Sequence, residues 1–315
     1  MLQQNSKPLI SIIIPAYNAE QTIIQTLDSV YNSTYTEFEV IVINDGSTDD
    51  TLLLLEQYPK PIKIYSTENK GVSNARNLGF EKSIGDYIQY LDADDLLLPD
   101  KLNVQVKALK ENNAGVAYGD WQKFEIEKNE TFITETITRK IEGDLEIAIF
   151  TDFWCPPAAI LYSRDVCKKL RWNETLPIIQ DARYFLDAAM MKNTFVYTPG
   201  VMALYRTAQY NSLSKKNDFL FLSDIYENTK DLYQIWKGDF AQKPEKRIAI
   251  IKSLRHCINR LSIVNKNLAS EAIELLLSID PTYIPKEKGL LRSFSKIIGY
   301  KNAENLAAWK RKYKG

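Results

Sequence analysis

Two different periods of apolar and polar residues alternate along the first hundred residues. Short continuous runs rich in Val and Ile, such as residues 10–15, are typical of strands buried on both faces. Between these runs, apolar residues recur three and four positions apart, as in Ile23, Leu27 and Val30, which predicts helices with one buried face. The pattern predicts strands at residues 10–15, 38–43, 62–65 and 87–91, and helices at 18–30, 51–58, 72–83 and 99–112.

This alternating order predicts an α/β fold, a Rossmann-like and mostly parallel sheet with helices on both faces. Further on, the pattern favours strands in residues 118–137 with a polar loop at 125–130, strands at 158–162 and 195–205, and helices at 144–150 and 179–191. Beyond about residue 211 only helical spacing remains, at residues 219–236, 244–264 and 268–279. We therefore expect two domains, an α/β domain over residues 1–214 and a helical C-terminal extension over residues 215–315.

The composition excludes several functional classes. Lys and Arg together equal Asp and Glu, at 40 each, so no overall charge favours a nucleic-acid partner. No basic segment followed by an apolar stretch opens the chain, and no apolar run approaches the roughly 20 residues of a membrane span. Three scattered cysteines, Cys155, Cys167 and Cys257, form no CxxC pair and indicate core positions in a reducing compartment. A cytoplasmic protein is expected.

Polar segments follow three of the predicted strands. They are residues 15–18 (PAYN), 44–47 (NDGS) and 92–95 (DADD). Ligands of open α/β sheets bind beyond the carboxyl ends of the strands, which is where all three segments fall. The coincidence predicts one ligand site.

The third segment is the most acidic. Asp92, Asp94 and Asp95 would repel one another unless a cation lies among them, and their oxygens suit Mg²⁺ or Mn²⁺ bound to substrate phosphates. An EF-hand is excluded, because Leu97 stands where that loop needs Gly and Asn103 where it needs Glu. The alternative interpretation is a solvated acidic turn before the next helix.

The other segments suit a nucleotide. Asp45 is a candidate acceptor for a base edge and Tyr17 a candidate stacking platform, although an ordinary turn and a packed aromatic are the alternatives. The helix that begins near residue 72 can receive an anion at its N-terminus, and Arg76 lies one turn further on; a capped helix with a surface Arg is the alternative. Asp181 lies near the start of a predicted helix, where an acidic side chain commonly compensates the helix dipole. No GxGxxG or GxxxxGK[ST] motif supports nicotinamide, flavin or P-loop binding.

Taken in order, these segments resemble the GT-A glycosyltransferases of family 2, as found in bacteria. The resemblance covers residues 9 to about 103 through SIIIPAYNAEQTIIQTLDSV, EVIVINDGSTDDT, ENKGVSNARNLG and GDYIQYLDADDLLLPDKL. It continues more weakly to about Ser214 through WCPPAAILYSR, LPIIQDARYFLDAA and ALYRTAQYNSLS. It implies a metal-dependent, inverting transfer of a monosaccharide from a nucleotide-sugar, usually a UDP-sugar, to a hydroxyl of a saccharide or lipid-linked saccharide. Bacterial surface polysaccharide or glycolipid synthesis is the implied setting.

The resemblance also implies roles for individual residues. Asp181 falls at the position of the catalytic base, and Asp92 and Asp94 form the DxD pair that meets ribose and metal, with Asp95 beside them. The implied nucleotide-sugar-binding residues are Pro15, Tyr17, Asn18, Asp45, Lys70, Arg76, Asp92, Asp94 and Arg206, and the implied metal ligands are Asp94, Asp92 and Asp95.

Two departures from the family pattern leave alternatives open. Gln180 replaces the more usual Glu, and no histidine follows Tyr205-Arg206, where Gln209 or Asn211 are candidates to replace it. The missing histidine supports a non-catalytic carbohydrate- or nucleotide-binding protein on a decayed transferase fold. A sugar nucleotidyltransferase is the other alternative, but it would normally carry a glycine-rich loop after the first strand, and residues 15–20 have none.

The C-terminal residues 286–314 are strongly basic. Nine Lys and Arg stand against only Glu287 and Glu304, with apolar residues interspersed among them, namely Leu290, Leu291, Phe294, Ile297, Ile298 and Trp309. Such a segment can lie on an anionic membrane, here the inner face of the plasma membrane. A basic helix docked on the transferase domain is the alternative interpretation.

Overall fold

The computed structural model describes residues 7–127, 130–207, 217–286 and 289–312. The chain divides into two compact units, residues 1–210 and 211–315. The predicted domain boundary, between residues 214 and 215, lies outside the described residues.

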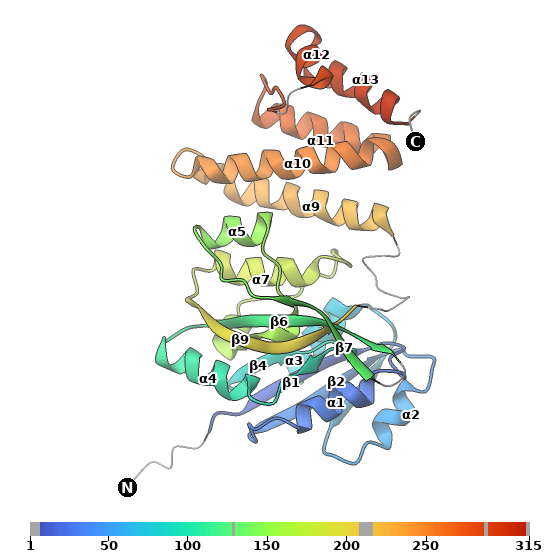
Figure 1. The fold of residues 1–315 in the computed structure, drawn as a ribbon, viewed down its shortest axis with the longest axis vertical. Helices are drawn as coiled ribbons and strands as arrows, with labels where there is room; N and C mark the ends of the chain where they lie inside the picture. Colours follow the sequence, from blue (N-terminus) through green and yellow to red (C-terminus); the bar gives the residue numbers. More distant parts are fainter. Residues whose placement is uncertain (1–6, 128–129, 208–216, 287–288, 313–315) are drawn as a thin grey trace. The chain divides into compact units, whose positions relative to one another are not determined.

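The first unit is built on one mixed sheet, shown in Figure 1. Its strand order is β3-β2-β1-β4-β8-β6-β9-β5, with β7 paired to β6. The four strands β3, β2, β1 and β4 are mutually parallel, whereas β8 runs antiparallel between β4 and β6. The strands are β1 (Ile10–Ala16), β2 (Phe38–Asp45), β3 (Lys63–Thr67), β4 (Tyr87–Tyr90), β5 (Leu96–Leu97), β6 (Val116–Glu127), β7 (Glu130–Ile137), β8 (Ile160–Ser163) and β9 (Phe195–Arg206). The predicted α/β fold is confirmed.

Helices flank this sheet. They are α1 (Ile23–Tyr31), α2 (Thr51–Glu56), α3 (Val72–Lys82), α4 (Lys101–Glu111), α5 (Leu145–Thr151), α6 (Arg164–Cys167) and α7 (Gln180–Met190), with a 3₁₀ turn η1 (Pro157–Ala159) before β8. Helix α3 covers β1 and β2, and α4 covers β6, β8 and β9. Some of the helices pack mainly on other helices, as α5 does on α7. At Gly79 of α3 the approach is so close that a Cβ would lie 2.3 Å from Cγ2 of Ile13, so a larger residue would push α3 off the sheet.

The end of β1 shows how the sheet opens toward its carboxyl edge. Pairing of β1 with β4 stops at Ile13, opposite Tyr90, while pairing with β2 continues to Ala16, opposite Asn44. Pro15 therefore lies beyond the stretch that pairs with β4, where its missing N–H loses no ladder bond on that side. The chains of β1 and β4 separate at this edge.

Two predicted elements differ from the structure. The polar loop expected at residues 125–130 is largely strand, since Glu125 of β6 lies opposite Phe132 of β7; residues 128–129 are outside the described parts. The helix expected at 18–30 begins only at Ile23. The reason is that Asn18 has a positive φ of 49°, which a right-handed helix does not allow. The backbone N–H groups of residues 18–20 instead donate to the side chains of Ser47, Thr51 and Asp49, over 2.7–3.2 Å.

The second unit consists of helices. They are α9 (Asp218–Trp236), α10 (Pro244–Val264), α11 (Lys266–Ile279), α12 (Leu290–Ile298) and α13 (Tyr300–Lys312), with a 3₁₀ turn η2 (Lys237–Asp239) after α9. Helix α10 packs against both α9 and α11 (Figure 1), and its apolar stripe of Leu254, Ile258 and Leu261 is fully buried. Within the described ranges, no helix has both the length and the apolar character that crossing a bilayer requires.

Both units also bury polar or sulfur-containing side chains in their cores. Glu304 of α13 is buried and forms ion pairs with Arg255 and Arg311. All three cysteines are buried free thiols, so their predicted core positions are confirmed. The three cysteines are therefore packing residues, as their scattered spacing in the sequence predicted.

Candidate active site

The three polar segments singled out in the sequence gather at one edge of the sheet. They follow β1, β2 and β4, which are neighbours in the order β2-β1-β4 and run parallel. Their carboxyl ends therefore point the same way, as the ligand rule for open sheets requires. The loops that carry them hold one another in place.

The loop after β1 presents an aromatic ring. Tyr17 is 51% exposed, so the face of its ring is accessible to a planar ligand. The next residue, Asn18, has a positive φ of 49°, and its Oδ1 accepts a 2.8 Å hydrogen bond from the backbone N–H of Thr48. Asn18 thus ties the β1 loop to the β2 loop. Pro15, by contrast, is buried within β1.

Asp45, the last residue of β2, fixes a third loop. The carboxylate is buried, and its two oxygens accept hydrogen bonds from the backbone N–H groups of Lys70 (2.9 Å) and Gly71 (2.8 Å). Gly46 has φ 73°, and a Cβ there would lie 2.7 Å from the backbone nitrogen of Asn69, so only glycine allows this approach. The loop that opens α3 is therefore held against the end of β2. The side chain of Lys70 is exposed.

Arg76 of α3 is a buried cation. Its Nη2 contacts the Asp92 carboxylate, and its guanidinium lies over the Trp172 ring, 4.2 Å from the centroid. Its Nε and Nη1 are buried with no hydrogen-bond partner among the described residues. Unpaired buried donors are costly and are satisfied when a ligand supplies acceptors. The alternative interpretation of Arg76 as a surface residue is therefore wrong.

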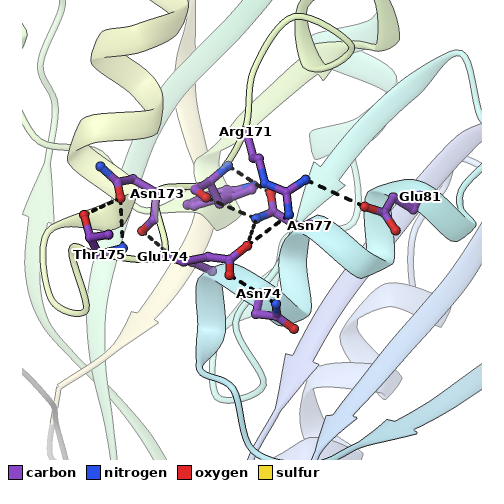
Figure 2. Close-up of polar contacts among 9 residues, drawn as sticks. Asn74, Asn77, Glu81, Arg171, Asn173, Glu174 and Thr175 are labelled. Carbon is purple, nitrogen blue, oxygen red and sulfur yellow. Dashed lines mark hydrogen bonds and ion pairs between the residues drawn. The ribbon is translucent and has the colours of Figure 1, made fainter.

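Residues 171–175 form a loop that hydrogen-bonds to α3, and we call this connection the clasp (Figure 2). Asn77 exchanges two hydrogen bonds with the backbone of Trp172, of 2.9 and 3.1 Å, and donates a third, of 2.9 Å, to Glu174. Asn74 also donates to Glu174, over 3.2 Å. These bonds place Trp172 between Arg76 and Tyr184, on whose ring it stacks at 4.1 Å. The clasp thus fixes the Arg76 guanidinium.

The acidic turn after β4 is crowded with negative charge. Burial, and then the charge of Asp92, raise the pKa of Asp94 to about 6. Burial, with help from Asp94 and Asp92, raises the pKa of Asp95 well above its ordinary value. The Oδ2 atom of Asp95 is buried with no partner among the described residues. A divalent cation would relieve this crowding, so the donor set fits one in charge and in oxygen chemistry.

Asp95 nevertheless differs from its two neighbours. It is fully buried, and its Oδ1 accepts a 3.0 Å hydrogen bond from the backbone N–H of Arg206. Among the described residues, no three acidic, His or Cys side chains are arranged as a metal site. The expected ligand trio of Asp92, Asp94 and Asp95 is therefore not assembled, because Asp95 is turned toward β9.

Arg206, the last residue of β9, reaches this turn from 112 residues further along the chain. Its Nε donates a 2.8 Å hydrogen bond to the carbonyl of Asp94, and its Nη2 donates over 2.8 Å to Gln25. Its guanidinium lies 4.5 Å from the ring centroid of Phe124. These contacts hold a cation beside the acidic turn.

Asp181 lies in the first turn of α7. Its Oδ2 accepts a 2.8 Å hydrogen bond from Nε1 of Trp154. Burial raises the pKa of Asp181, while the Trp154 hydrogen bond and the charge of Arg76 oppose the increase; the charge of Asp92 adds to it. The charges of Arg76 and Asp92 are therefore close enough to act on Asp181. The structure thus brings the predicted base, the buried cation and the acidic turn together.

Three aromatic rings, for which the sequence predicted no role, cluster beside Asp181. Trp121, Trp154 and Tyr205 pack edge to face, with centroids 5.1–5.6 Å apart. Burial, and then the charges of the acidic turn and of Asp181, raise the pKa of Tyr205. Tyr205 therefore lies within electrostatic reach of both Asp181 and the turn. In the sequence, two of these rings stood in segments that resemble the family, Trp154 in WCPPAAILYSR and Tyr205 in ALYRTAQYNSLS.

Comparison with known proteins decides the family. The model of the family described as Glycosyl transferase family 2 matches residues 11–171. An uncharacterized glycosyltransferase of Haemophilus influenzae is 31% identical over 256 residues, which are 80% of this chain and 94% of that protein. The chain belongs to glycosyltransferase family 2. This assignment favours glycosyl transfer over the nucleotidyltransferase alternative.

Other family 2 relatives differ in length and in what their names state. A glycosyltransferase of Rickettsia bellii is 44% identical over 120 residues, but this chain spans only 17% of its length. An Escherichia coli relative, 27% identical over 76% of this chain and 89% of that protein, is named UDP-Glc:alpha-D-GlcNAc-diphosphoundecaprenol beta-1,3-glucosyltransferase WfgD. The matched family model ends before Asp181 and Arg206 and does not cover these two residues.

Solved structures show the same fold. Staphylococcus aureus TarS 1–349, in complex with UDP-GlcNAc, matches 97% of this chain and 93% of its own with a TM-score of 0.66 at 15% identity. The mannosyltransferase PcManGT of Pyrobaculum calidifontis, in complex with GDP-Man and Mn²⁺, matches 98% and 88% with a TM-score of 0.52 at 17% identity. The predicted GT-A fold with C-terminal helices is therefore confirmed. Gln209 and Asn211, the candidates to replace the family histidine, lie outside the described residues.

Proposed function

We propose that this family 2 protein is an inverting glycosyltransferase that moves a monosaccharide from a UDP-sugar to a hydroxyl acceptor. One observation supports this most strongly. Arg76 contacts Asp92 of the acidic turn at the carboxyl edge of the sheet, and the charges of both residues act on the carboxylate of Asp181. This proximity supports a leaving-group site at the acidic turn with Asp181 as general base, the two groups that single displacement needs.

The donor would occupy the loops at the ends of β1, β2 and β4. Tyr17 would stack on the base, Asp45 would meet the base edge, and Arg76 would use its unpaired donors on the donor. Arg206 would contact the diphosphate. The remaining proposed contacts are from Pro15, Asn18 and Lys70.

A divalent cation, Mn²⁺ or Mg²⁺, held by Asp92 and Asp94 would neutralise charge that develops on the departing phosphate. Asp95 would support this turn through its bond to the Arg206 backbone instead of acting as a ligand. Asp181 would take the proton of the acceptor hydroxyl as its oxygen attacks the anomeric carbon. The bond from that carbon to the phosphate oxygen breaks, UDP leaves, and the configuration inverts.

The acceptor and the cellular setting are also part of the proposal. The E. coli relative is named for an acceptor linked to diphosphoundecaprenol, which supports a lipid-linked saccharide acceptor here. Surface polysaccharide or glycolipid synthesis would then take place in the cytoplasm, with peripheral contact at the inner face of the plasma membrane. We also propose residues 1–214 as the catalytic domain and residues 215–315 as a helical extension.

Release of UDP from a panel of UDP-sugars, with Mn²⁺ present, tests the activity. The wild-type protein should release UDP from at least one of them. The Asp181→Asn variant should bind UDP like the wild type but turn over roughly 100-fold more slowly, the usual contribution of a general base. Full activity of this variant would remove Asp181 from the mechanism. UDP binding without release from any sugar would support the non-catalytic alternative.

A further inference from the structure

Helix α12 carries a continuous apolar stripe between two glycines. Leu290, Phe294 and Ile297 follow one another at spacings of four and three residues, so their side chains share one face of the helix. Gly289 and Gly299 flank the helix with φ values of 148° and 78°, which other residues rarely adopt. The nine-residue helix is thus a defined element and not the frayed end of α11 or α13.

The burial of α12 is the reverse of what a packed helix shows. Four of its five large apolar side chains are exposed, with Leu290 at 63%, Phe294 at 43%, Ile297 at 78% and Ile298 at 37%, while Leu291 is half-buried. Its one buried residue is the polar Ser295, whose hydroxyl donates to the Leu291 carbonyl over 2.7 Å. In α10 of the same unit, the apolar stripe is buried. The apolar face of α12 therefore does not belong to the core of its unit.

The chain around α12 is positively charged. Arg292 and Lys296 lie on α12 itself, on the side opposite the apolar face, and the exposed Lys286 precedes the helix. Lys301 follows it and pairs with Glu274 at the surface. The acidic Glu304 nearby does not offset them at the surface, because it is buried between two arginines. An exposed apolar face on a basic helical segment is complementary to a layer of acyl chains with anionic headgroups.

We propose that α12 docks on the surface of a bilayer that contains anionic phospholipid, with the face of Leu290, Phe294 and Ile297 inserted among the headgroups. Nine residues at about 1.5 Å each cover less than half of the roughly 30 Å apolar layer, so α12 lies along the surface. This docking rests on the peripheral membrane contact of the proposed function, and it assigns that contact to α12 and to anionic phospholipid.

Co-sedimentation of the full chain with lipid vesicles tests this docking. The wild-type protein should sediment with vesicles containing phosphatidylglycerol, less so at high salt, and stay in the supernatant with phosphatidylcholine alone. Ile297→Glu should weaken binding at least tenfold, since one buried apolar side chain contributes about that factor and the carboxylate also repels the lipid. The matched control is Ile248→Glu on α10, where Ile248 is 53% exposed, and it should bind like the wild type.

A UDP titration of the same variants separates this inference from the proposed function. Ile297→Glu should bind UDP as the wild type does while it loses the vesicles, and vesicle binding by a protein that releases no UDP would leave the docking intact. Equal sedimentation of Ile297→Glu and wild type would overturn the docking. Equal binding of the wild type to both lipids would also overturn it. The same holds if the wild type forms a dimer that does not bind vesicles and that Ile297→Glu separates into monomers, because a second copy would then cover the face.

Discussion

At the scale of single residues, the site is defined by buried charges that have specific partners. Arg76 meets Asp92 and leaves two donors unpaired, whereas Asp181 gains one hydrogen bond from Trp154. Burial disfavours the ionised form of Asp181, and the Trp154 bond favours it. The fraction of Asp181 that is ionised at a given pH therefore depends on Trp154.

This dependence predicts the pH profile of a Trp154→Phe variant. Without the hydrogen bond the pKa of Asp181 should rise further, so the proposed base would lose its ionised form at a higher pH. The acid limb of the kcat/KM profile should move up by about one pH unit, the size expected for one hydrogen bond to a charged group. Activity at alkaline pH should largely recover. The measurement is UDP release as a function of pH.

Trp121→Phe is the matched control for this variant. Trp121 belongs to the same aromatic cluster, but the bond to Asp181 comes from Trp154. Its acid limb should stay at the wild-type pH. An unchanged limb in Trp154→Phe, or an equal shift in both variants, would contradict a role for the hydrogen bond.

At the scale of elements, the clasp between α3 and residues 171–175 connects a helix to a loop about 100 positions away. Asn77 is its centre, because it bonds to both backbone groups of the buried Trp172 and to Glu174. Trp172 in turn carries the Arg76 guanidinium on its ring. The position of Arg76 thus depends on contacts that are distant in sequence.

An Asn77→Ala variant should therefore lose stability and donor affinity together. Removing the amide leaves the buried N–H of Trp172 without its acceptor, which should lower the free energy of unfolding by roughly 1–3 kcal/mol. UDP should also bind more weakly, since Trp172 no longer holds Arg76. Urea unfolding and a UDP titration measure the two effects.

Asn74→Ala supplies the comparison for Asn77→Ala. Asn74 makes one exposed bond to Glu174, so its loss should change stability by no more than about 0.5 kcal/mol. If Asn77→Ala lost stability but bound UDP normally, the clasp would be a structural feature with no part in donor binding.

The contrast between local pattern and distant contact also explains how much the sequence could predict. Strands β1 to β4 and helix α3 were located to within about two residues, because runs of β-branched residues and helical spacing are local signals. The two-residue strand β5 was missed, since it exists only through pairing with β9. The acidic turn and Asp181 stood out by residue type, but the partners Trp154 and Trp172 depend on tertiary contacts.

At the scale of the whole molecule, the chain comprises an α/β unit and a helical unit, and the second is stabilised by a buried ion-pair cluster. Glu304 of α13 accepts from Arg255 and Arg311 while almost no water reaches its carboxylate. Breaking a buried pair leaves an uncompensated charge and costs much more than losing an exposed pair. The attachment of α13 to α10 should therefore be sensitive to this one residue.

Glu304→Gln should loosen the helical unit. We expect a loss of about 3–5 kcal/mol in its free energy of unfolding and faster hydrogen exchange in α10 and α13. Glu274→Gln, which removes the exposed pair with Lys301, should cost less than about 1 kcal/mol. Hydrogen exchange followed by mass spectrometry compares the two variants. Unchanged exchange in α13 of Glu304→Gln would show that the cluster does not hold the helix.

The whole account depends on the acidic turn after β4 as the place where cation and donor diphosphate bind together. Calorimetric titration of UDP into the wild type and the Asp94→Asn variant, each with and without Mn²⁺, tests this most directly. Wild-type affinity should depend strongly on Mn²⁺, and Asp94→Asn should lose that dependence, because its amide cannot match a carboxylate as a ligand. Equal UDP affinity of both proteins in Mn²⁺ would contradict the account.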